Sequence, residues 1–436
     1  MINLSENVDN LSFYEKKSDI TMDNKKQKKF TLPAISKFEQ NVLSFIQQHL
    51  LMIAMFAVTA LALIIRFMLR ENVSGDAYYY LLPWYDTIKA GGFKSLSQPV
   101  GNYGILYQFC ITLFTVLPMK PLYTYKLFSV IFDFLLAAFG MHVIMKHETS
   151  HRELKGVLMY AAVLLSPIVF LNSAYWAQCD VIYTYFCVLS VYEMYRDKYL
   201  PSMILFGVAI TFKLQAIFVL PFLLFCYLYK KRFSILYFLT IPVTMIALSL
   251  PGIVMGRGVF EVFTIYFEQT TTYQQMTMNY PSFWTLFQNA SLDEFYQKFH
   301  TAATLLTVAV LGVYMVLWIK KKIPLNLRNS FSMAFIISYT CVLFLPAMHE
   351  RYGFIYEILA IFLAFWYYKT IPMLVLMYFT TFGTYSHFLF AYGIDSVRFA
   401  WFNVLVYVAY VIYLHKQMFK TAESDDAPKL SQPAKA

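Results

Sequence analysis

Three polar residues, His349, Glu350 and Arg351, interrupt two strongly apolar stretches in LPAMHERYGFIYEILAIFLAF, which begins at Leu345. A charged side chain at membrane depth costs roughly 2.5–3.5 kcal/mol on insertion scales, so such a side chain is expected to serve a function. Arginine binds phosphate oxygens in a bidentate manner, which favours an oxyanion site containing His349 and Arg351. Glu350 is equally compatible with a structural ion pair to Arg351.

Two further cations occur beside apolar segments. Lys213 lies within TFKLQAIFVLP, and Arg257 lies within GRGVFE. A single Lys or Arg near a helix end more often extends its charge toward the membrane surface than takes part in chemistry. This explanation suits Lys213 poorly, because its neighbours on both sides are apolar. We predict that both cations help to bind a phosphate.

Three carboxylates are candidates for proton transfer. Asp76 and Asp86 occur in ENVSGDAYYYLLPWYDTIKAGGF, just after the first apolar run, whereas Asp133 lies inside a later one. A carboxylate at the lipid surface suits a general base that removes a proton from a hydroxyl group. Asp76 and Asp86 are each equally compatible with a capping role in a loop or helix. Asp133 has no identifiable partner, and a buried packing role is favoured for it.

The composition indicates which elements must hold these residues. The chain has 436 residues, of which 59% are hydrophobic and 14% are charged, and its mean hydropathy is +0.53. Soluble proteins average about 25% charged residues, so the sequence predicts an all-α, polytopic membrane protein. The net charge of +10 comes from short basic clusters between apolar runs, which argues against nucleic-acid binding. The first run begins near Leu50, too late for a cleavable signal peptide.

Several common sites are not indicated. The five cysteines lack the spacing of metal ligands or of a disulfide framework. We find no glycine-rich phosphate loop and no dinucleotide motif, so we expect no cofactor and no metal site. The chain has only 15 glycines, which argues modestly against a transporter built on close helix contacts.

Apolar runs of suitable length predict about twelve transmembrane helices. Two short segments between Ser202 and Tyr229, broken at Lys213, belong to this number. The other predicted spans are Leu50–Leu69, Leu122–Met145, Gly156–Leu171, Cys179–Tyr195, Phe233–Val254, Thr301–Ile319, Ser330–Leu345, Tyr352–Tyr368, Ile371–Phe390 and Val397–Leu414.

The basic clusters predict the orientation of the chain, because cytoplasmic loops are rich in Lys and Arg. With these clusters inside, residues 1–46 and 419–436 are cytoplasmic tails, and residues 47–418 form the membrane domain. Loops 70–121 and 255–300 are then external. The apolar segment Gly104–Pro118 is expected to lie in the outer interface without crossing the membrane. The candidate polar residues thereby converge on one membrane face.

This convergence suggests one reaction. A base at the membrane surface would remove a proton from an acceptor hydroxyl, while cations nearer the lipid would bind a phosphate leaving group. A sugar linked through phosphate to a membrane lipid would be displaced at its anomeric carbon. One carboxylate is sufficient for this reaction, and the anomeric configuration would invert.

Four motifs resemble the GT-C superfamily, the polytopic glycosyltransferases that use polyprenyl-phosphate sugars. SGD at Ser74–Asp76 is placed where these enzymes keep their catalytic Asp, in the first external loop. GNYGILY (residues 101–107), GRGVFEVFTIYF (residues 256–267) and MHERYGF are similar to passages of the dolichyl-phosphate-glucose glucosyltransferases. The chain departs from those enzymes at GNYGILY, where they have a Pro-Pro-Leu run, and at Arg351, where they have Lys. NSAYWAQCDVIYTYF and KLQAIFVLP look still more like bacterial proteins related to GPI-anchor mannosyltransferases.

The resemblance implies an inverting hexosyltransferase, similar to mannosyltransferases, with Asp76 as the base. His349 and Arg351 would lie near the donor phosphate, and Arg257 would order the external loop or contact phosphate. Supporting roles are expected for residues of the same motifs and of the first external loop, namely Glu350, Tyr352, Asp86, Asn102, Tyr103, Trp176, Gln178, Asp180 and Gln215.

The expected partners are a polyprenyl-phosphate-linked sugar donor, a glycan, lipid or protein acceptor, and the lipids of the cell membrane. A carrier or flippase for a lipid-linked glycan is the main alternative, since basic residues in a cavity would serve it equally well. Inverted repeats with broken helices in matching positions would favour a carrier, and the sequence shows none. A non-catalytic membrane scaffold would explain the basic tails but not the convergence of polar residues.

Overall fold

A computed structural model describes residues 35–287 and 293–426, without the side chains of residues 270–272 and 424–426. The structure is 80% helical, which confirms the predicted all-α class. The chain divides into two units, Met1–Leu50 and Leu51–Ala436, and helix α1 (Lys37–Met68) runs through the boundary between them. The predicted cytoplasmic tails lie largely outside the described residues.

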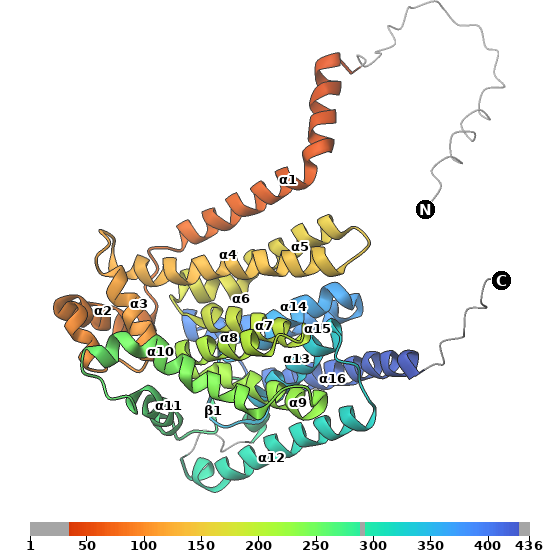
Figure 1. Cartoon of the computed structure of the whole chain (residues 1–436). Helices are drawn as coiled ribbons and strands as arrows, with labels where there is room; N and C mark the ends of the chain where they lie inside the picture. Colours follow the sequence, from red (N-terminus) through yellow and green to blue (C-terminus); the bar gives the residue numbers. More distant parts are fainter. Residues whose placement is uncertain (1–34, 288–292, 427–436) are drawn as a thin grey trace, which may run out of the picture. The chain divides into compact units, whose positions relative to one another are not determined.

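The second unit contains helices that vary widely in length (Figure 1). Its α-helices after α1 are α2 (Leu82–Gly91), α3 (Ile105–Phe114), α4 (Pro121–His147), α5 (Arg152–Leu164), α6 (Pro167–Phe170), α7 (Asp180–Tyr195), α8 (Tyr199–Phe212), α9 (Leu220–Lys230), α10 (Thr240–Val254), α11 (Glu261–Thr272), α12 (Asp293–Lys320), α13 (Leu327–Phe344), α14 (Phe354–Trp366), α15 (Ile371–Phe390) and α16 (Ser396–Asp426).

Short π- and 3₁₀-helical segments and one small pair of strands complete the fold. The strands β1 (Thr277–Met278) and β2 (Met348–His349) pair in parallel, with Met278 opposite His349. The helical segments are η1 (Ala77–Leu81), η2 (Gly92–Ser97), η3 (Leu171–Tyr175), η4 (Leu214–Val219), η5 (Ile235–Leu239), η6 (Phe283–Leu286) and η7 (Tyr368–Thr370).

The prediction of about twelve spans is wrong. Among the described residues, six helices are long and apolar enough to cross a membrane, or seven if the bent pair α5 and α6–η3 forms one span. Most of the other predicted spans correspond to shorter helices, such as α14 with 13 residues and α8 with 14, whereas α15 has 20 residues but is not among the six. At a rise of about 1.5 Å per residue, the shorter helices reach only about 20 Å, less than the roughly 30 Å of a hydrocarbon core.

Some boundaries agree with the sequence. The predicted break at Lys213 is confirmed, because α8 ends at Phe212 and Lys213 has extended backbone geometry before η4 begins. The segment Gly104–Pro118 contains α3, whose ten residues are too few to cross the membrane, as expected. The first long loop also contains η1, α2 and η2. Its interfacial placement and the orientation of the chain stay predictions.

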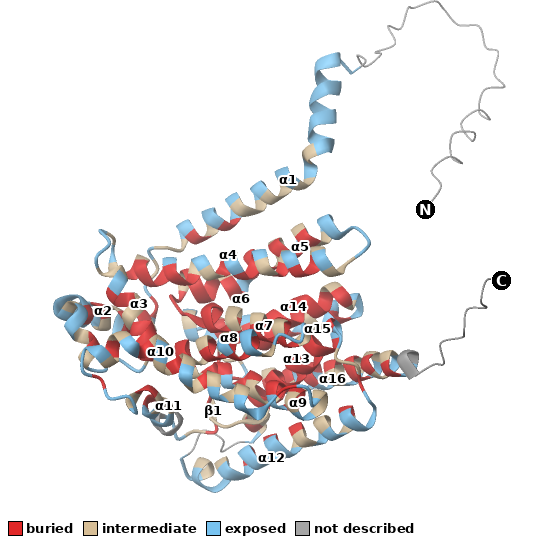
Figure 2. Ribbon diagram, viewed as in Figure 1, coloured by how far each residue is buried: buried red, intermediate tan, exposed pale blue. Residues whose placement is uncertain are grey.

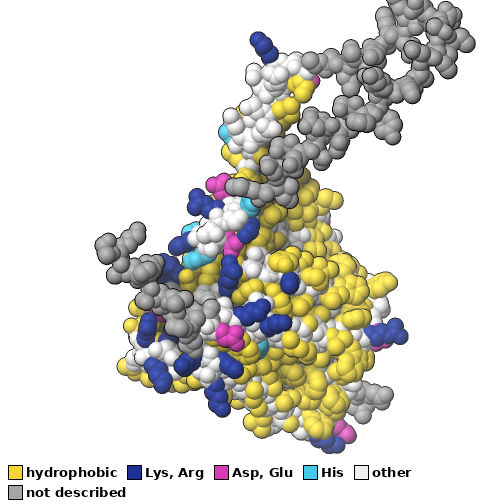
Figure 3. Space-filling model, turned by 90° about the vertical axis from the view of Figure 1, so that its right-hand side faces the viewer, with side chains coloured by type: hydrophobic (Ala, Val, Ile, Leu, Met, Phe, Trp, Pro, Cys, Tyr) yellow, Lys and Arg dark blue, Asp and Glu magenta, His cyan; other side chains and the backbone are white. Residues whose placement is uncertain are grey.

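The core of the second unit is formed by α7, α8, α13 and α14. Helix α4 lies against α5 on one side of these helices, and α12 lies on the opposite side (Figure 1). Figure 2 shows α13 and α14 almost entirely buried and α12 largely exposed. In Figure 3, hydrophobic side chains cover much of one face, and Lys and Arg side chains gather along one side of that view. This distribution is typical of a helical membrane protein.

The ends of the core helices position the candidate residues. The amino end of α7 follows the motif that contains Trp176 and Gln178, and the carboxyl end of α13 leads into the loop that contains Arg351. Lys213 lies at the break between α8 and η4. Because α13 packs against both α7 and α14, these loops emerge at one end of the core.

Candidate active site

Asp76 lies directly after α1 and before η1, where neighbouring loops hold its carboxylate. Its Oδ2 accepts hydrogen bonds from Trp176 Nε1 at 2.9 Å and from Gln178 Nε2 at 2.6 Å. Ser74 Oγ donates to the carbonyl of Trp176 at 2.9 Å, and Tyr103 donates to Gln178 Oε1 at 3.2 Å. The SGD motif is thereby fixed to the motif that contains Trp176. Within the described structure, Asp76 Oδ1 accepts no hydrogen bond.

Arg351 connects three carboxylates at this end of the core. Its Nη1 lies 2.9 Å from Glu350 Oε1 and 3.8 Å from Asp76 Oδ2, and its Nε lies 3.7 Å from Asp180 Oδ2. The guanidinium also lies over the ring of Trp176, 5.4 Å from its centroid. The structural ion pair between Glu350 and Arg351, which the sequence left open, is therefore present. Arg351 also stays close to the carboxylates of Asp76 and Asp180.

These charges shift the pKa values of the loop residues. Burial disfavours the charged form of Arg351, but Glu350, Asp76 and Asp180 outweigh it and raise the pKa of the guanidinium well above its ordinary value. Burial also acts to raise the pKa of Glu350, yet its interactions with His349 and Arg351 lower it below the ordinary range. Glu350 is therefore ionised and holds Arg351 in place.

Lys213 is held by the aspartate that begins α7. Its Nζ lies 2.5 Å from Asp180 Oδ1, and Asn172 Nδ2 donates to Asp180 Oδ2 at 2.8 Å. Asp180 has no exposed side-chain area, whereas Lys213 retains 7%. Asp180 therefore orients both Lys213 and Arg351. The sequence predicted all of these residues except Asn172, which stands at the start of the same NSAYWAQCD motif.

A cavity of about 360 Å³ opens in front of the two cations. Its polar wall includes Lys213, His300, His349 and Arg351, and none of the described residues that line it is Asp or Glu. The three carboxylates of the cluster lie behind the cations. The cavity therefore offers positive charge to a ligand, although two fixed cations and three carboxylates give the cluster as a whole a net negative charge.

The rest of the cavity is largely apolar. His349 lies on β2, with its ring centroid 4.7 Å from that of Tyr273 and 5.1 Å from that of Tyr352. Asn102, Tyr103 and Gln215 also line the cavity, as do Phe212, Leu214, Ile217, Phe218, Leu345, Pro346, Ala347 and Met348. An amphiphile with an anionic group at one end would match this distribution.

Two predicted site residues do not join the cluster. Asp86 is exposed on α2. Arg257 pairs with Glu261, at 2.8 Å between Nε and Oε2, and lines a separate pocket of about 170 Å³. That pocket shares Asn102 and Gln269 with the main cavity. A role of Arg257 in phosphate binding stays a prediction, and its present geometry favours the ordering of the loop.

The sequence did not predict one buried ion pair, which joins Arg66 on α1 to Asp133 on α4. Asp133 Oδ2 accepts from Arg66 Nε at 3.0 Å, from Arg66 Nη2 at 2.8 Å and from Ser173 Oγ at 2.6 Å. Arg66 lies on α1, which leads to Asp76, and Ser173 lies on η3, which leads to Trp176. The ion pair thus fixes both sides of the contact between Asp76 and Trp176. The available signal was Arg66 itself, a charge within an apolar run.

Comparison with known families extends this geometry. Residues 102–346, more than half of the chain, match the model of glycosyltransferase family 87, a GT-C family of polytopic membrane glycosyltransferases. No curated protein matches the chain. The matched region contains Trp176, Gln178, Asp180 and Lys213, whereas Asp76 lies 26 residues before its start and Arg351 five residues after its end.

Proposed function

The chain belongs to glycosyltransferase family 87, and from this premise we propose that it transfers a sugar from a polyprenyl-phosphate donor to an acceptor hydroxyl with inversion. The acceptor would be a glycan, a lipid or a protein. The reaction would take place on the extracytoplasmic face of the cell membrane, with both termini in the cytoplasm. This face follows from the basic clusters of the sequence.

Asp76 is proposed as the general base. Trp176 and Gln178 fix its Oδ2, so that Oδ1 is available to accept a proton from the acceptor hydroxyl. The hydroxyl oxygen then forms a bond to the anomeric carbon from the face opposite the phosphate. The bond between that carbon and the phosphate oxygen breaks, and its electron pair stays on the phosphate.

Lys213, His349 and Arg351 are proposed to stabilise the phosphate that leaves. They face the cavity, and the carboxylates paired with Lys213 and Arg351 orient these two side chains. Arg351 can donate two parallel hydrogen bonds to phosphate, whereas Lys213 acts as a point charge. Arg351 also lies 3.8 Å from Asp76, so the proposed base and leaving-group sites are adjacent.

The observation that carries this proposal is the mixed lining of the cavity, in which Lys213 and Arg351 occur together with many apolar side chains. A phosphate would lie at Lys213 and Arg351, and the first isoprene units would lie against Ile217, Phe218 and Leu345. A free nucleotide sugar has no hydrocarbon to place against these side chains. The side chain of Ile217 is 39% exposed, so apolar area remains for a ligand to cover.

The test is incubation of the purified protein with a panel of polyprenyl-phosphate sugars and a mixture of hydroxyl acceptors. We expect one donor to be consumed, with equimolar release of polyprenyl phosphate and formation of a glycoside of inverted configuration. Movement of an unchanged donor across vesicles that contain the protein, without release of polyprenyl phosphate, would instead show a carrier.

A further inference from the structure

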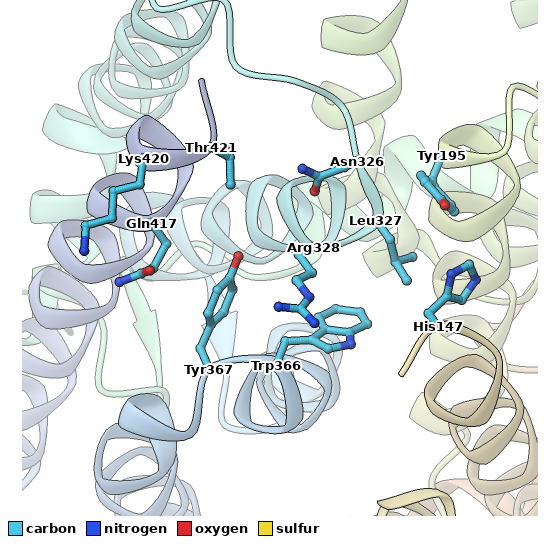
Figure 4. A pocket seen from close by; sticks show the side chains of 10 residues that line it. All are labelled: His147, Tyr195, Asn326, Leu327, Arg328, Trp366, Tyr367, Gln417, Lys420 and Thr421. Carbon is cyan, nitrogen blue, oxygen red and sulfur yellow. The ribbon is translucent and has the colours of Figure 1, made fainter. Parts of the chain in front are cut away.

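A third pocket, of about 490 Å³, is lined by the ten residues that Figure 4 shows. Tyr195 ends α7, Trp366 ends α14, and Arg328 is the second residue of α13. The candidate active site is at the other ends of these three helices. Since α13 has 18 residues, the two sites are about 27 Å apart.

The lining of this pocket is rich in hydrogen-bond donors. None of the described residues that line it is Asp or Glu, and Arg328, Lys420 and Trp366 can only donate. Trp366 is 8% exposed, and its Nε1 has no hydrogen-bond partner in the described structure. The complete lining is His147, Tyr195, Asn326, Leu327, Arg328, Trp366, Tyr367, Gln417, Lys420 and Thr421. A lining with these donors, and with no carboxylate among its described residues, is suited to a ligand that accepts hydrogen bonds.

The positive charge of this pocket is only partly balanced. Arg328 Nη2 lies 2.8 Å from Glu148 Oε1, but Glu148 Oε2 also binds Lys155 at 2.5 Å. One carboxylate thus serves two cations. Lys420 is exposed on α16, with no carboxylate within ion-pair distance among the described side chains. An anion in the pocket would restore the balance.

Helix ends alone do not account for these cations. The carboxyl ends of α4, α7 and α14 border the pocket and favour nearby positive charge. Arg328, however, lies in the first turn of α13, where the helix dipole disfavours a cation. The half-balanced charge of Arg328, together with a lining whose described residues include no carboxylate, therefore points to a ligand with anionic oxygen atoms.

We propose that this pocket binds the headgroup of an anionic phospholipid, with the phosphate at the guanidinium of Arg328 and with Lys420 on another side of the pocket (Figure 4). Basic pockets between membrane helices bind anionic headgroups, and Trp and Tyr side chains concentrate at headgroup depth. Tyr195, Trp366 and Tyr367 supply such aromatic groups here. This proposal is independent of the reaction proposed above, because the two sites share no residue.

The test is thermal unfolding of the purified protein in detergent, titrated with phosphatidylglycerol, phosphatidylcholine or inorganic phosphate. We expect phosphatidylglycerol to raise the unfolding midpoint much more than the other two. Lys420→Ala should weaken phosphatidylglycerol binding about fivefold, since a basic residue near an anionic surface contributes about that factor. Arg328→Gln removes the charge at the proposed phosphate position, and it should weaken binding by about tenfold or more.

Lys416→Ala is the matched control, because Lys416 is an exposed lysine of the same helix outside the pocket. It should change phosphatidylglycerol binding less than twofold. Equal binding by wild type, Lys420→Ala and Arg328→Gln would overturn the proposal. A shift with inorganic phosphate that equals the shift with phosphatidylglycerol would also overturn it, because it would assign the pocket to a free anion.

Discussion

Replacement of Arg351 by Gln separates a structural role of this residue from a role in donor binding. The side chain of Glu350 has no exposed area, and its ion pair with Arg351 is 2.9 Å long. Removal of one partner of a buried pair leaves an uncompensated charge, at a cost of about 3–5 kcal/mol in folding free energy. Arg351→Gln should therefore be markedly destabilised, and its lower activity alone would be ambiguous.

The double variant Glu350→Gln/Arg351→Gln removes both charges and leaves two amides that can hydrogen-bond to each other. Replacement of both partners is far less destabilising than replacement of one, so most of the lost stability should return. Donor use should not return, because a charge-assisted hydrogen bond to phosphate contributes about 1.5–3 kcal/mol, or roughly 10- to 150-fold.

The assay measures the unfolding midpoint and the kcat/KM for donor on the same preparations of four proteins. These are wild type, Glu350→Gln, Arg351→Gln and the double variant. Arg351→Lys adds a second comparison, since it keeps the charge but loses the bidentate geometry. Its kcat/KM should fall between the value for wild type and the value for Arg351→Gln. If kcat/KM recovers together with stability in the double variant, Arg351 only pairs with Glu350, and the proposed phosphate site is wrong.

Three further predictions concern the ion pair, the cavity and the topology. Asp133→Asn should lower the free energy of unfolding by about 3–5 kcal/mol, because it leaves Arg66 buried without its partner, while Asp86→Asn on exposed α2 should have little effect in the same unfolding assay. Ile217→Trp should fill the apolar part of the cavity and raise KM for a long-chain donor several-fold with little change in kcat; an unchanged KM would place the lipid chain elsewhere. A Cys introduced at Ser150, between α4 and α5, should not react with a membrane-impermeant reagent in intact cells, and efficient labelling there would reverse the predicted orientation.

The cluster was more predictable from the sequence than the number of spans. Asp76, Trp176, Gln178 and Arg351 are polar residues in short motifs beside apolar runs, and polar groups near a membrane are rarely without function. The structure brings these four residues together at one end of the core, whereas their place on the outer membrane face stays a prediction. The particular bonds, such as that from Trp176 Nε1 to Asp76, could not be predicted because they join residues about one hundred positions apart.

The span count failed because hydropathy does not distinguish lipid from a protein interior. Helix α14 is as apolar as a membrane span, but it has 13 residues and is buried by its neighbours. The run Gly156–Leu171 is broken at Ser166 and Pro167, where α5 ends and α6 begins. Pro167 and the shortness of the apolar run in α14 were the sequence signals that these segments do not form continuous spans. The pairing of Arg66 with Asp133, by contrast, joins residues 67 positions apart, which no local pattern predicts.

Transfer by Asp76→Asn, measured beside Asp86→Asn, tests the proposed mechanism most directly. The Asn side chain is nearly isosteric and still accepts hydrogen bonds from Trp176 and Gln178 through its oxygen, but it cannot take a proton. At matched protein levels, with donor binding measured in parallel, Asp76→Asn should bind donor and transfer sugar about 10²–10⁴-fold more slowly. Asp86→Asn should remain close to wild type. Normal transfer by Asp76→Asn would contradict the mechanism, whether or not Asp86→Asn is active.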